Sequence, residues 1–194
     1  TDITSFSCSD LGTVLVTLTV TDDADMSTDS CTATVTVEDN VAPTAATQDI
    51  TVQLDATGNA SIVPSDVDDG SADTCGTINL VSVVPNTFDC SDSGANTVTL
   101  TVNDGNGNTG TATATVTVED NIAPTAIAQN ITIALDATGS VSIVPSDIDN
   151  GSNDNCGTVN LMNVSPNVFN CSNLGNNLVE LTINDSNGKT DTAT

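Results

Sequence analysis

Short runs of alternating apolar and polar residues recur along the chain. In TATATVTVE (residues 111–119) the Val side chains fall on one face and the intervening Thr side chains on the other, as a half-buried antiparallel strand requires. Similar β-branched runs separated by turns rich in Asp, Asn and Gly occupy residues 49–54, 60–65, 77–84 and 96–102. No segment has a convincing helical period. The pattern therefore predicts an all-β fold.

The sequence repeats itself every 81 residues. VEDNVAPTA begins at residue 37 and VEDNIAPTA at residue 118, and an ungapped alignment of residues 41–113 with 122–194 gives 46 identities in 73 positions. A unit of this length can bury its own core, which favours tandem immunoglobulin-like β-sandwich repeats. We expect the C-terminal half of one repeat at 1–40, a complete repeat at 41–121, and a repeat lacking its last strand end at 122–194. The chain is thus expected to be part of a longer protein.

The charge balance excludes some partners. The chain has 26 acidic residues against one Lys or Arg, a formal net charge of −25, and no His. Nucleic acids and anionic membrane surfaces would be repelled, because binding to them depends on Lys and Arg. High charge can also indicate disorder, but the apolar content of 37% and the alternating pattern favour packed strands. We expect neither nucleic-acid binding nor membrane insertion.

The cysteines suggest disulfides in an oxidising, extracellular setting. Cys75 and Cys90 recur as Cys156 and Cys171 with the same spacing of 15 residues, so each couple is predicted to pair within its own repeat. Cys8 aligns with Cys90, and its partner would then lie before residue 1; a bridge from Cys8 to Cys31 is the alternative. A zinc site is disfavoured because the chain has no CxxC motif and no His.

Acidic loops are predicted to meet where one repeat follows another. In an immunoglobulin-like topology the incoming linker, the loop after the second strand and the loop before the last strand lie at the same end of a domain. Carboxylates gathered there would repel one another without a cation, and Ca²⁺ prefers carboxylate and amide oxygens. The predicted calcium ligands are therefore Asp39, Asn40, Asp66, Asp68 and Asp104 at one joint, and Asp120, Asn121, Asp147, Asp149 and Asp185 at the next.

Two alternatives to this ligand set stay open. Glu38, Asp69 or Asp73 could replace some of the residues named for the first joint. The Asp, Asn and Gly residues could instead serve only as turn formers and solubilising charge. Lys189 stands where Asn108 stands in the preceding repeat, which argues against the turn at 104–110 being a complete calcium loop by itself.

Several motifs together resemble a known repeat family. DTCG or DNCG, then FDCS, then VTLTVNDGNGNTGTATATVTVEDN followed by APTA is similar to the hyalin-like repeat arrays of large Bacteroidota cell-surface adhesins, including those of gliding motility exported by type IX secretion. The resemblance implies long surface filaments. A looser similarity links DVDDG and VEDNVAP to the DxDxG segment and the linker of cadherins, although the cadherin linker has an additional acid and Asn.

These observations favour a structural function over an enzymatic one. We expect a stalk or filament segment of an extracellular adhesin, in contact with neighbouring repeats, stiffened by calcium and active in attachment or gliding. No catalytic residues are assigned, because the chain lacks His, Tyr and Arg and its Ser residues have no evident base. The alternative is a ligand-binding or carbohydrate-binding module, which the absence of Trp and Tyr disfavours.

Overall fold

The computed structural model describes residues 3–194 and confirms an all-β, immunoglobulin-like chain of short antiparallel strands. The described residues divide into two compact units. The first comprises 3–50, Ile62–Pro85 and Thr97–Thr115; the second comprises Thr51–Ser61, Asn86–Asn96 and Val116–Thr194. This division cuts through the middle repeat, so the repeat boundaries drawn from the sequence stay a prediction.

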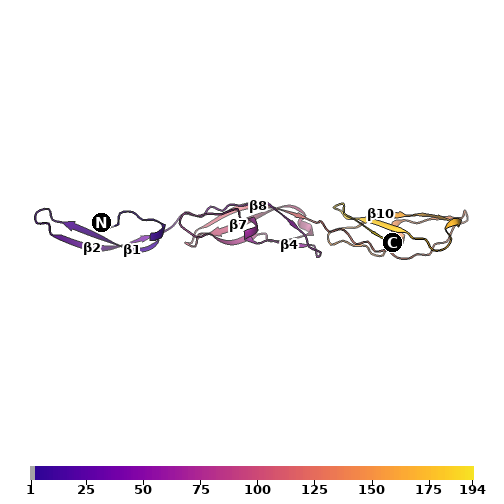
Figure 1. The fold of residues 1–194 in the computed structure, drawn as a ribbon, viewed down its shortest axis with the longest axis horizontal. Helices are drawn as coiled ribbons and strands as arrows, with labels where there is room; N and C mark the ends of the chain where they lie inside the picture. Colours follow the sequence, from indigo (N-terminus) through magenta and orange to yellow (C-terminus); the bar gives the residue numbers. More distant parts are fainter. Residues whose placement is uncertain (1–2) are drawn as a thin grey trace. The chain divides into compact units, whose positions relative to one another are not determined.

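In the first unit, a two-stranded hairpin precedes the middle repeat. Strand β1 (Gly12–Thr21) pairs with β2 (Thr28–Val37) along its whole length, from Gly12 opposite Val37 to Thr21 opposite Thr28, and the two strands lie side by side in Figure 1. Further along, β5 (Asn79–Val84) pairs with β7 (Gly94–Asn103). These pairings place the ends of β2 and β7 where the acidic loops begin.

Four of the alternating runs of the middle repeat form one sheet, whereas the run predicted at 60–65 is a strand only as far as Ser61. Its strand order is β3-β8-β7-β5, with β3 at Ile50–Gln53 and β8 at Thr109–Glu119. A second small sheet pairs β4 (Asn59–Ser61) with β6 (Thr87–Asp89). Inward side chains of β7 and β8 are fully buried at alternate positions, because a strand turns successive residues to opposite faces: they are Val98, Leu100, Val102, Val116 and Val118.

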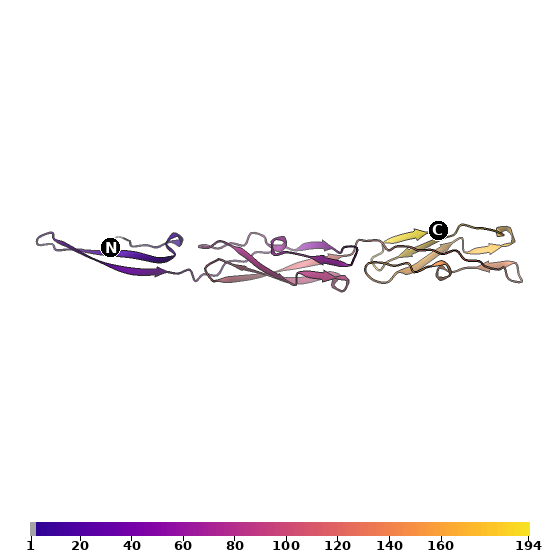
Figure 2. The same cartoon turned by 90° about the horizontal axis from the view of Figure 1, so that it is seen from below.

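In the second unit, the third repeat packs two small sheets around an apolar core. Strand β9 (Ser140–Ser142) pairs with β11 (Val168–Asn170), and β10 (Asn160–Ser165) pairs with β12 (Glu180–Asn184), which also pairs with β13 (Thr190–Ala193). Phe169 of β11 packs with Leu181 and Ile183 of β12. Figure 2 shows these C-terminal strands from a second side.

Two one-turn helices, which the sequence pattern did not predict, follow β4 in the middle repeat and β9 in the third. They are α1 (Pro64–Val67) and α2 (Pro145–Ile148), and each begins with Pro at its first position, where a missing N–H costs nothing. They are too short for a 3.6-residue pattern to develop. Within residues 3–194 no helix has the length and hydropathy to cross a membrane.

Candidate metal centre

Two trios of aspartates are the candidate metal-binding groups. The first acidic cluster is Asp39, Asp73 and Asp104, and the second is Asp120, Asp154 and Asp185; in each, one carboxylate oxygen per residue lies within 4.8 Å of the others. Asp104, Asp120 and Asp185 are 1%, 6% and 2% exposed. Burial of charge at this level is costly without a compensating partner, so these three carboxylates need hydrogen-bond donors or a cation beside them.

Corresponding elements bring each trio together. Asp39 and Asp120 follow the final strands β2 and β8, Asp104 and Asp185 follow β7 and β12, and Asp73 and Asp154 lie in the loops before β5 and β10. In the first cluster, Gly76 lets the loop that carries Asp73 approach Asp104 closely. A Cβ at Gly76 would collide with the backbone and Cβ of Asp104. The fold thus gathers carboxylates that are far apart in the sequence.

Amide donors hold the first acidic cluster. Asp104 Oδ1 accepts backbone N–H bonds from Asn106, Gly107 and Asn108 at 2.8, 3.1 and 3.1 Å, and its Oδ2 accepts from Asn108 Nδ2 at 2.6 Å. Burial raises the pKa of the Asp104 carboxyl, but the Asn108 side chain and these backbone amides outweigh it, and the pKa lies below its usual value. Asp104 is therefore held as a carboxylate.

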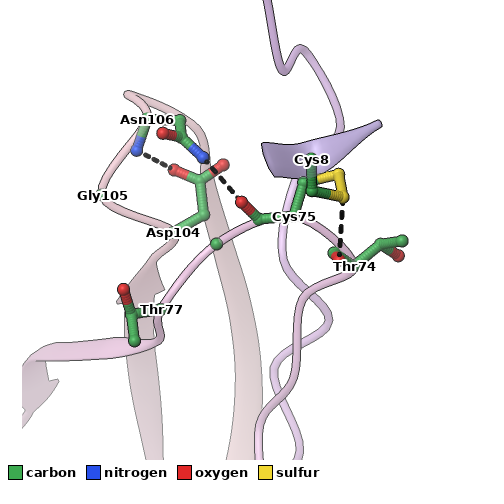
Figure 3. A pocket seen from close by; sticks show the side chains of 8 residues that line it. Cys8, Thr74, Cys75, Thr77, Asp104, Gly105 and Asn106 are labelled. Atoms are coloured by element: carbon green, nitrogen blue, oxygen red, sulfur yellow. Dashed lines mark hydrogen bonds between the residues drawn. A yellow bond between two sulfur atoms is a disulfide. The ribbon is translucent and has the colours of Figure 1, made fainter. Parts of the chain in front are cut away.

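The linker is tied to the same turn. Asn106 Nδ2 donates to Asp39 Oδ2 at 3.2 Å and to the Cys75 carbonyl at 3.3 Å, while Asn108 Nδ2 also donates to the Asp39 carbonyl at 3.0 Å. Figure 3 shows Asn106 beside Asp104 and the Cys8–Cys75 disulfide. These side-chain amides connect the end of one repeat to a loop of the next.

The second acidic cluster has a related but sparser set of donors. Asp120 Oδ2 accepts from Asn187 Nδ2 at 3.2 Å, and Asp120 Oδ1 accepts from Asn155 Nδ2 at 3.3 Å. Asp185 Oδ1 accepts from the backbone N–H groups of Asn187 and Lys189 at 2.9 and 2.7 Å. In the described part of the chain, Asp154 Oδ1, Asn155 Oδ1 and Asp185 Oδ2 are buried without any hydrogen-bond partner.

The clusters contain some of the ligands expected from the sequence and omit others. Asp39, Asp104, Asp120 and Asp185 are cluster members; Asp73, named as a possible replacement, is the third member of the first cluster, and Asp154 is its counterpart. The remaining predicted ligands, which belong to neither cluster, are Asn40, Asp66, Asp68, Asn121, Asp147 and Asp149. Asp73 and Asp154 are marked in the sequence only by the Asp two positions before each Cys-Gly pair.

The DVD and DID acids form local turns instead. Asp66 Oδ2 accepts from the Val63 N–H at 2.7 Å and thereby caps α1, and Asp147 does the same for α2 through the Val144 N–H at 2.8 Å. Asp68 accepts from the Ser71 hydroxyl and backbone, which holds the pKa of its carboxyl below the usual value. Asp149 Oδ1 accepts the backbone N–H of Ser152 at 3.2 Å, and the pKa of its carboxyl lies below the usual value because of the Ser152 side chain and the nearby backbone amides. Turn chemistry satisfies these carboxylates within a few residues.

The two predicted Asn ligands lie at the surface. Asn40 and Asn121 are exposed, and the Asn121 side chain donates to Gln53 Oε1 and, at 3.3 Å, to Glu119 Oε2. Asn121 therefore attaches to strand residues of the middle repeat.

A capping role for Asp66 has a testable consequence. We expect Asp66→Ala to lower the free energy of unfolding by about 1 kcal/mol, because α1 loses the acceptor for an N-terminal N–H. Urea denaturation followed by circular dichroism measures this change. Calcium affinity should be unaffected in Asp66→Ala but reduced in the matched variant Asp73→Ala. A loss of calcium affinity in Asp66→Ala would instead support Asp66 as a ligand, as the sequence predicts.

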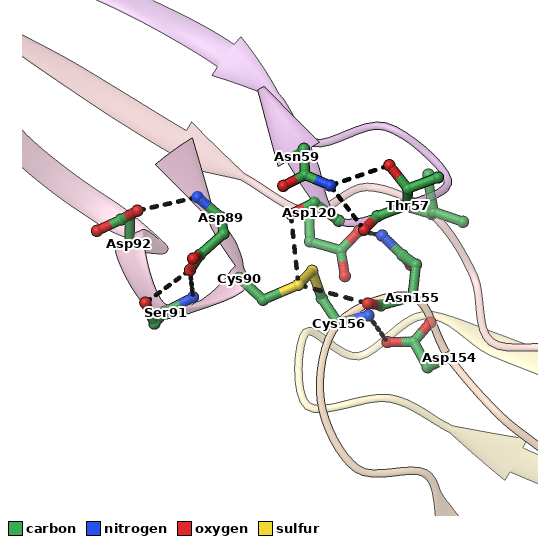
Figure 4. The surroundings of a disulfide bond; sticks show 12 residues. Thr57, Asn59, Asp89, Cys90, Ser91, Asp92, Asp120, Asp154, Asn155 and Cys156 are labelled. Atoms are coloured by element: carbon green, nitrogen blue, oxygen red, sulfur yellow. Dashed lines mark hydrogen bonds between the residues drawn. A yellow bond between two sulfur atoms is a disulfide. The ribbon is translucent and has the colours of Figure 1, made fainter. Parts of the chain in front are cut away.

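Disulfides join consecutive repeats. Cys8 bonds to Cys75 and Cys90 bonds to Cys156, with sequence separations of 67 and 66 residues. Cys8 and Cys90 each begin a 3₁₀ turn, Cys8–Asp10 and Cys90–Asp92, and their partners lie in the Cys-Gly loops that carry Asp73 and Asp154. Figure 4 shows Cys156 beside Asp154 and Asn155. One cysteine of each disulfide therefore lies in the same loop as an aspartate of an acidic cluster.

The predicted pairing of Cys75 with Cys90, and of Cys156 with Cys171, is wrong. A bridge within the repeat would require β6 to fold back on β5, because a disulfide tolerates a Cα separation of only about 7 Å. Instead β5 pairs with β7 and β6 pairs with β4, so the chain does not return to Cys75. The alternative bridge from Cys8 to Cys31 is wrong as well: Cys31 and Cys171 are free and exposed.

Glycine makes room for the bridge between the middle and third repeats. Gly58 has φ of +75°, and a Cβ there would lie 2.6 Å from Cys90 Sγ and 3.2 Å from Cys156 Sγ. The turn before β4 therefore lies directly against the bridge. Asn155 Nδ2 donates to the Asp55 carbonyl of this turn at 3.2 Å, which adds a second connection between the two repeats.

Comparisons with known proteins give only distant similarity. No family model matches the chain, and no curated protein matches it. A protocadherin gammaB7 EC3-6 cis-dimer structure is similar at 18% identity and a TM-score of 0.34, over 94% of this chain and 59% of that one. The human Desmocollin-1 ectodomain is similar at 13% identity and a TM-score of 0.31, over 93% of this chain and 43% of that one. The chain spans less than two thirds of either structure.

Proposed function

We propose that this chain is an extracellular structural segment of a large bacterial surface adhesin, and that calcium bound by the acidic clusters fixes consecutive repeats to one another. The resemblance of DTCG, FDCS and VEDN to hyalin-like repeats supports the bacterial origin and an action in attachment or gliding motility. The two disulfides between repeats support an oxidising location.

One observation carries the calcium proposal. Asp185 is 2% exposed and its Oδ2 has no hydrogen-bond partner, although it lies in a trio of carboxylates. A buried carboxylate oxygen left unpaired is strongly destabilising. A divalent cation would remove this cost and the mutual repulsion of the three carboxylates.

The chemistry of the donors fits calcium. Both clusters offer only oxygen ligands, from carboxylates and from nearby amide side chains such as Asn155, with no His or Cys thiolate in either trio. Oxygen-only sites with several carboxylates are typical of Ca²⁺, and the weak affinities of extracellular modules suit millimolar calcium. Asp39, Asp73 and Asp104 would hold one ion, and Asp120, Asp154 and Asp185 another. The bound ion would supply positive charge that ties loops of two repeats together.

Calorimetric titration with calcium tests this proposal. We expect saturable binding with dissociation constants on the order of 0.1 to 1 mM, measured at constant ionic strength so that screening of the net charge does not contribute. The double variant Asp39→Asn/Asp120→Asn should lose this binding, because each cluster loses one carboxylate.

The matched control is Asp66→Asn/Asp147→Asn, which has the same net charge and leaves both clusters intact. It should bind calcium as the unaltered chain does. Equal weakening in both double variants would show that calcium responds to overall charge alone. No saturable heat in the unaltered chain would overturn the proposal.

A further inference from the structure

The two acidic clusters differ at one position. In the first cluster, Asn108 Nδ2 donates to Asp104 Oδ2 at 2.6 Å. The corresponding residue in the third repeat is Lys189, and the corresponding oxygen, Asp185 Oδ2, has no partner. The same carboxylate is therefore satisfied by an amide in one repeat and left unsatisfied in the next.

The second cluster also has other unpaired oxygens. Asp154 Oδ1 and Asn155 Oδ1 are buried without a hydrogen-bond partner in the described chain. Asn155 aligns with Thr74 of the middle repeat, so the second cluster has an amide oxygen where the first has a hydroxyl side chain. Together with Asp185 Oδ2, these atoms give three buried acceptors that no protein donor satisfies.

From this difference we propose that the second acidic cluster is the stronger divalent-cation site, and that Asn108 makes the first cluster the weaker one. The inference rests on the proposed calcium function. In the second cluster a cation meets free acceptors, so its binding sacrifices no hydrogen bond at Asp185 Oδ2. In the first cluster the cation competes with the Asn108 amide for Asp104 Oδ2, and the lost hydrogen bond to a charged group opposes binding.

The Lys189 ammonium is the obvious rival to a metal ion. It would neutralise Asp185 if it donated to the free oxygen, yet Asp185 Oδ2 accepts no hydrogen bond. Lys189 instead contacts Asp185 through its backbone, donating its N–H at 2.7 Å to Asp185 Oδ1 and accepting from the Asp185 N–H at 3.0 Å. In the second cluster it therefore stands where the preceding repeat has an amide donor.

Calcium titration of two single variants tests the proposal. Asp185→Asn should weaken the tighter binding step at least about tenfold, the scale seen when groups that support a metal are removed, whereas Asp104→Asn should leave that step within about twofold. Asn is isosteric with Asp and keeps the oxygen that accepts the turn N–H bonds. Circular dichroism and an unchanged disulfide map verify that both variants fold.

Asn108→Lys provides an independent test by placing the third-repeat residue in the first cluster. The weaker step should then move toward the affinity of the tighter one. Loss of the tighter step in Asp104→Asn, or equal affinity at both clusters in the unaltered chain, would overturn the ranking while leaving calcium binding itself intact. No binding in the unaltered chain would instead defeat the proposed function.

Discussion

Replacing Cys90 and Cys156 together by serine is expected to lower the free energy of unfolding by about 4 kcal/mol. The bridge spans 66 residues, and in the chain-entropy model closing a loop of that length restricts the unfolded chain by about this amount. Urea denaturation followed by circular dichroism suits a chain without Trp or Tyr.

The matched control is Cys31→Ser. Cys31 is free and exposed on β2, so its replacement should change the free energy of unfolding by no more than about 0.5 kcal/mol. Peptide mapping without reduction provides the covalent check. Cleavage before Asp residues should release a cross-linked peptide that contains Cys90 and Cys156. A peptide that links Cys75 to Cys90 would contradict the arrangement described above.

The strands could be predicted from the sequence because buried and exposed side chains alternate along a half-buried strand, which gives the apolar positions a period of two residues. Val116 and Val118 are at most 2% exposed, and Ala114 on the same face is 5% exposed. The same pattern predicted the ends of β7 and β8, and therefore that Asp104 and Asp120 would lie at the start of a loop or linker. Their burial could not be predicted, because Asp, Asn and Gly are equally typical of exposed turns.

Asp73 and Asp154, the remaining members of the two clusters, were harder to predict. Asp66 and Asp68 were predicted because the loop after the second strand of an immunoglobulin-like domain lies at the same end as the incoming linker. Their carboxylates instead accept hydrogen bonds from Val63 and Ser71 nearby. Asp73 instead accepts the Cys75 N–H at 2.7 Å, and the disulfide from Cys75 to Cys8 lies beside it. The pairing of Cys75 with Cys8 is a long-range feature that local turn propensity does not encode.

Periodicity alone leaves the disulfide pairing open. In a tandem array, a spacing that recurs within each repeat implies an equally regular spacing between neighbours, so periodicity alone cannot separate the two pairings. The separations of 67 and 66 residues between FSCS or FDCS and the next Cys-Gly pair were the competing signal. Deciding between them required the strand pairing of β5 and β6.

Calcium is expected to raise the thermal stability of the chain substantially. A ligand that binds only the folded chain stabilises it in proportion to the logarithm of its concentration relative to the dissociation constant. For an affinity of about 0.1 to 1 mM, 10 mM calcium should add about 1.5 to 3 kcal/mol for each occupied cluster. For a chain of this length, the added free energy of unfolding from each occupied cluster corresponds to a rise in Tm of roughly 5 to 10 °C.

The removal of cluster carboxylates should abolish this gain. The double variant Asp104→Asn/Asp185→Asn replaces the two most buried members, which are 1% and 2% exposed, with uncharged side chains of the same shape. Its melting temperature should hardly depend on calcium. The charge-matched variant Asp66→Asn/Asp147→Asn should gain as much as the unaltered chain, which separates specific binding from screening of the net charge of −25.

Thermal unfolding in 10 mM calcium and in excess chelator, at equal ionic strength, is the most direct test that a cation holds the carboxylates of adjoining repeats together. Bound calcium predicts a higher Tm for the unaltered chain and for the charge-matched control, and no rise for Asp104→Asn/Asp185→Asn. A Tm of the unaltered chain that is the same in calcium and in chelator would contradict it.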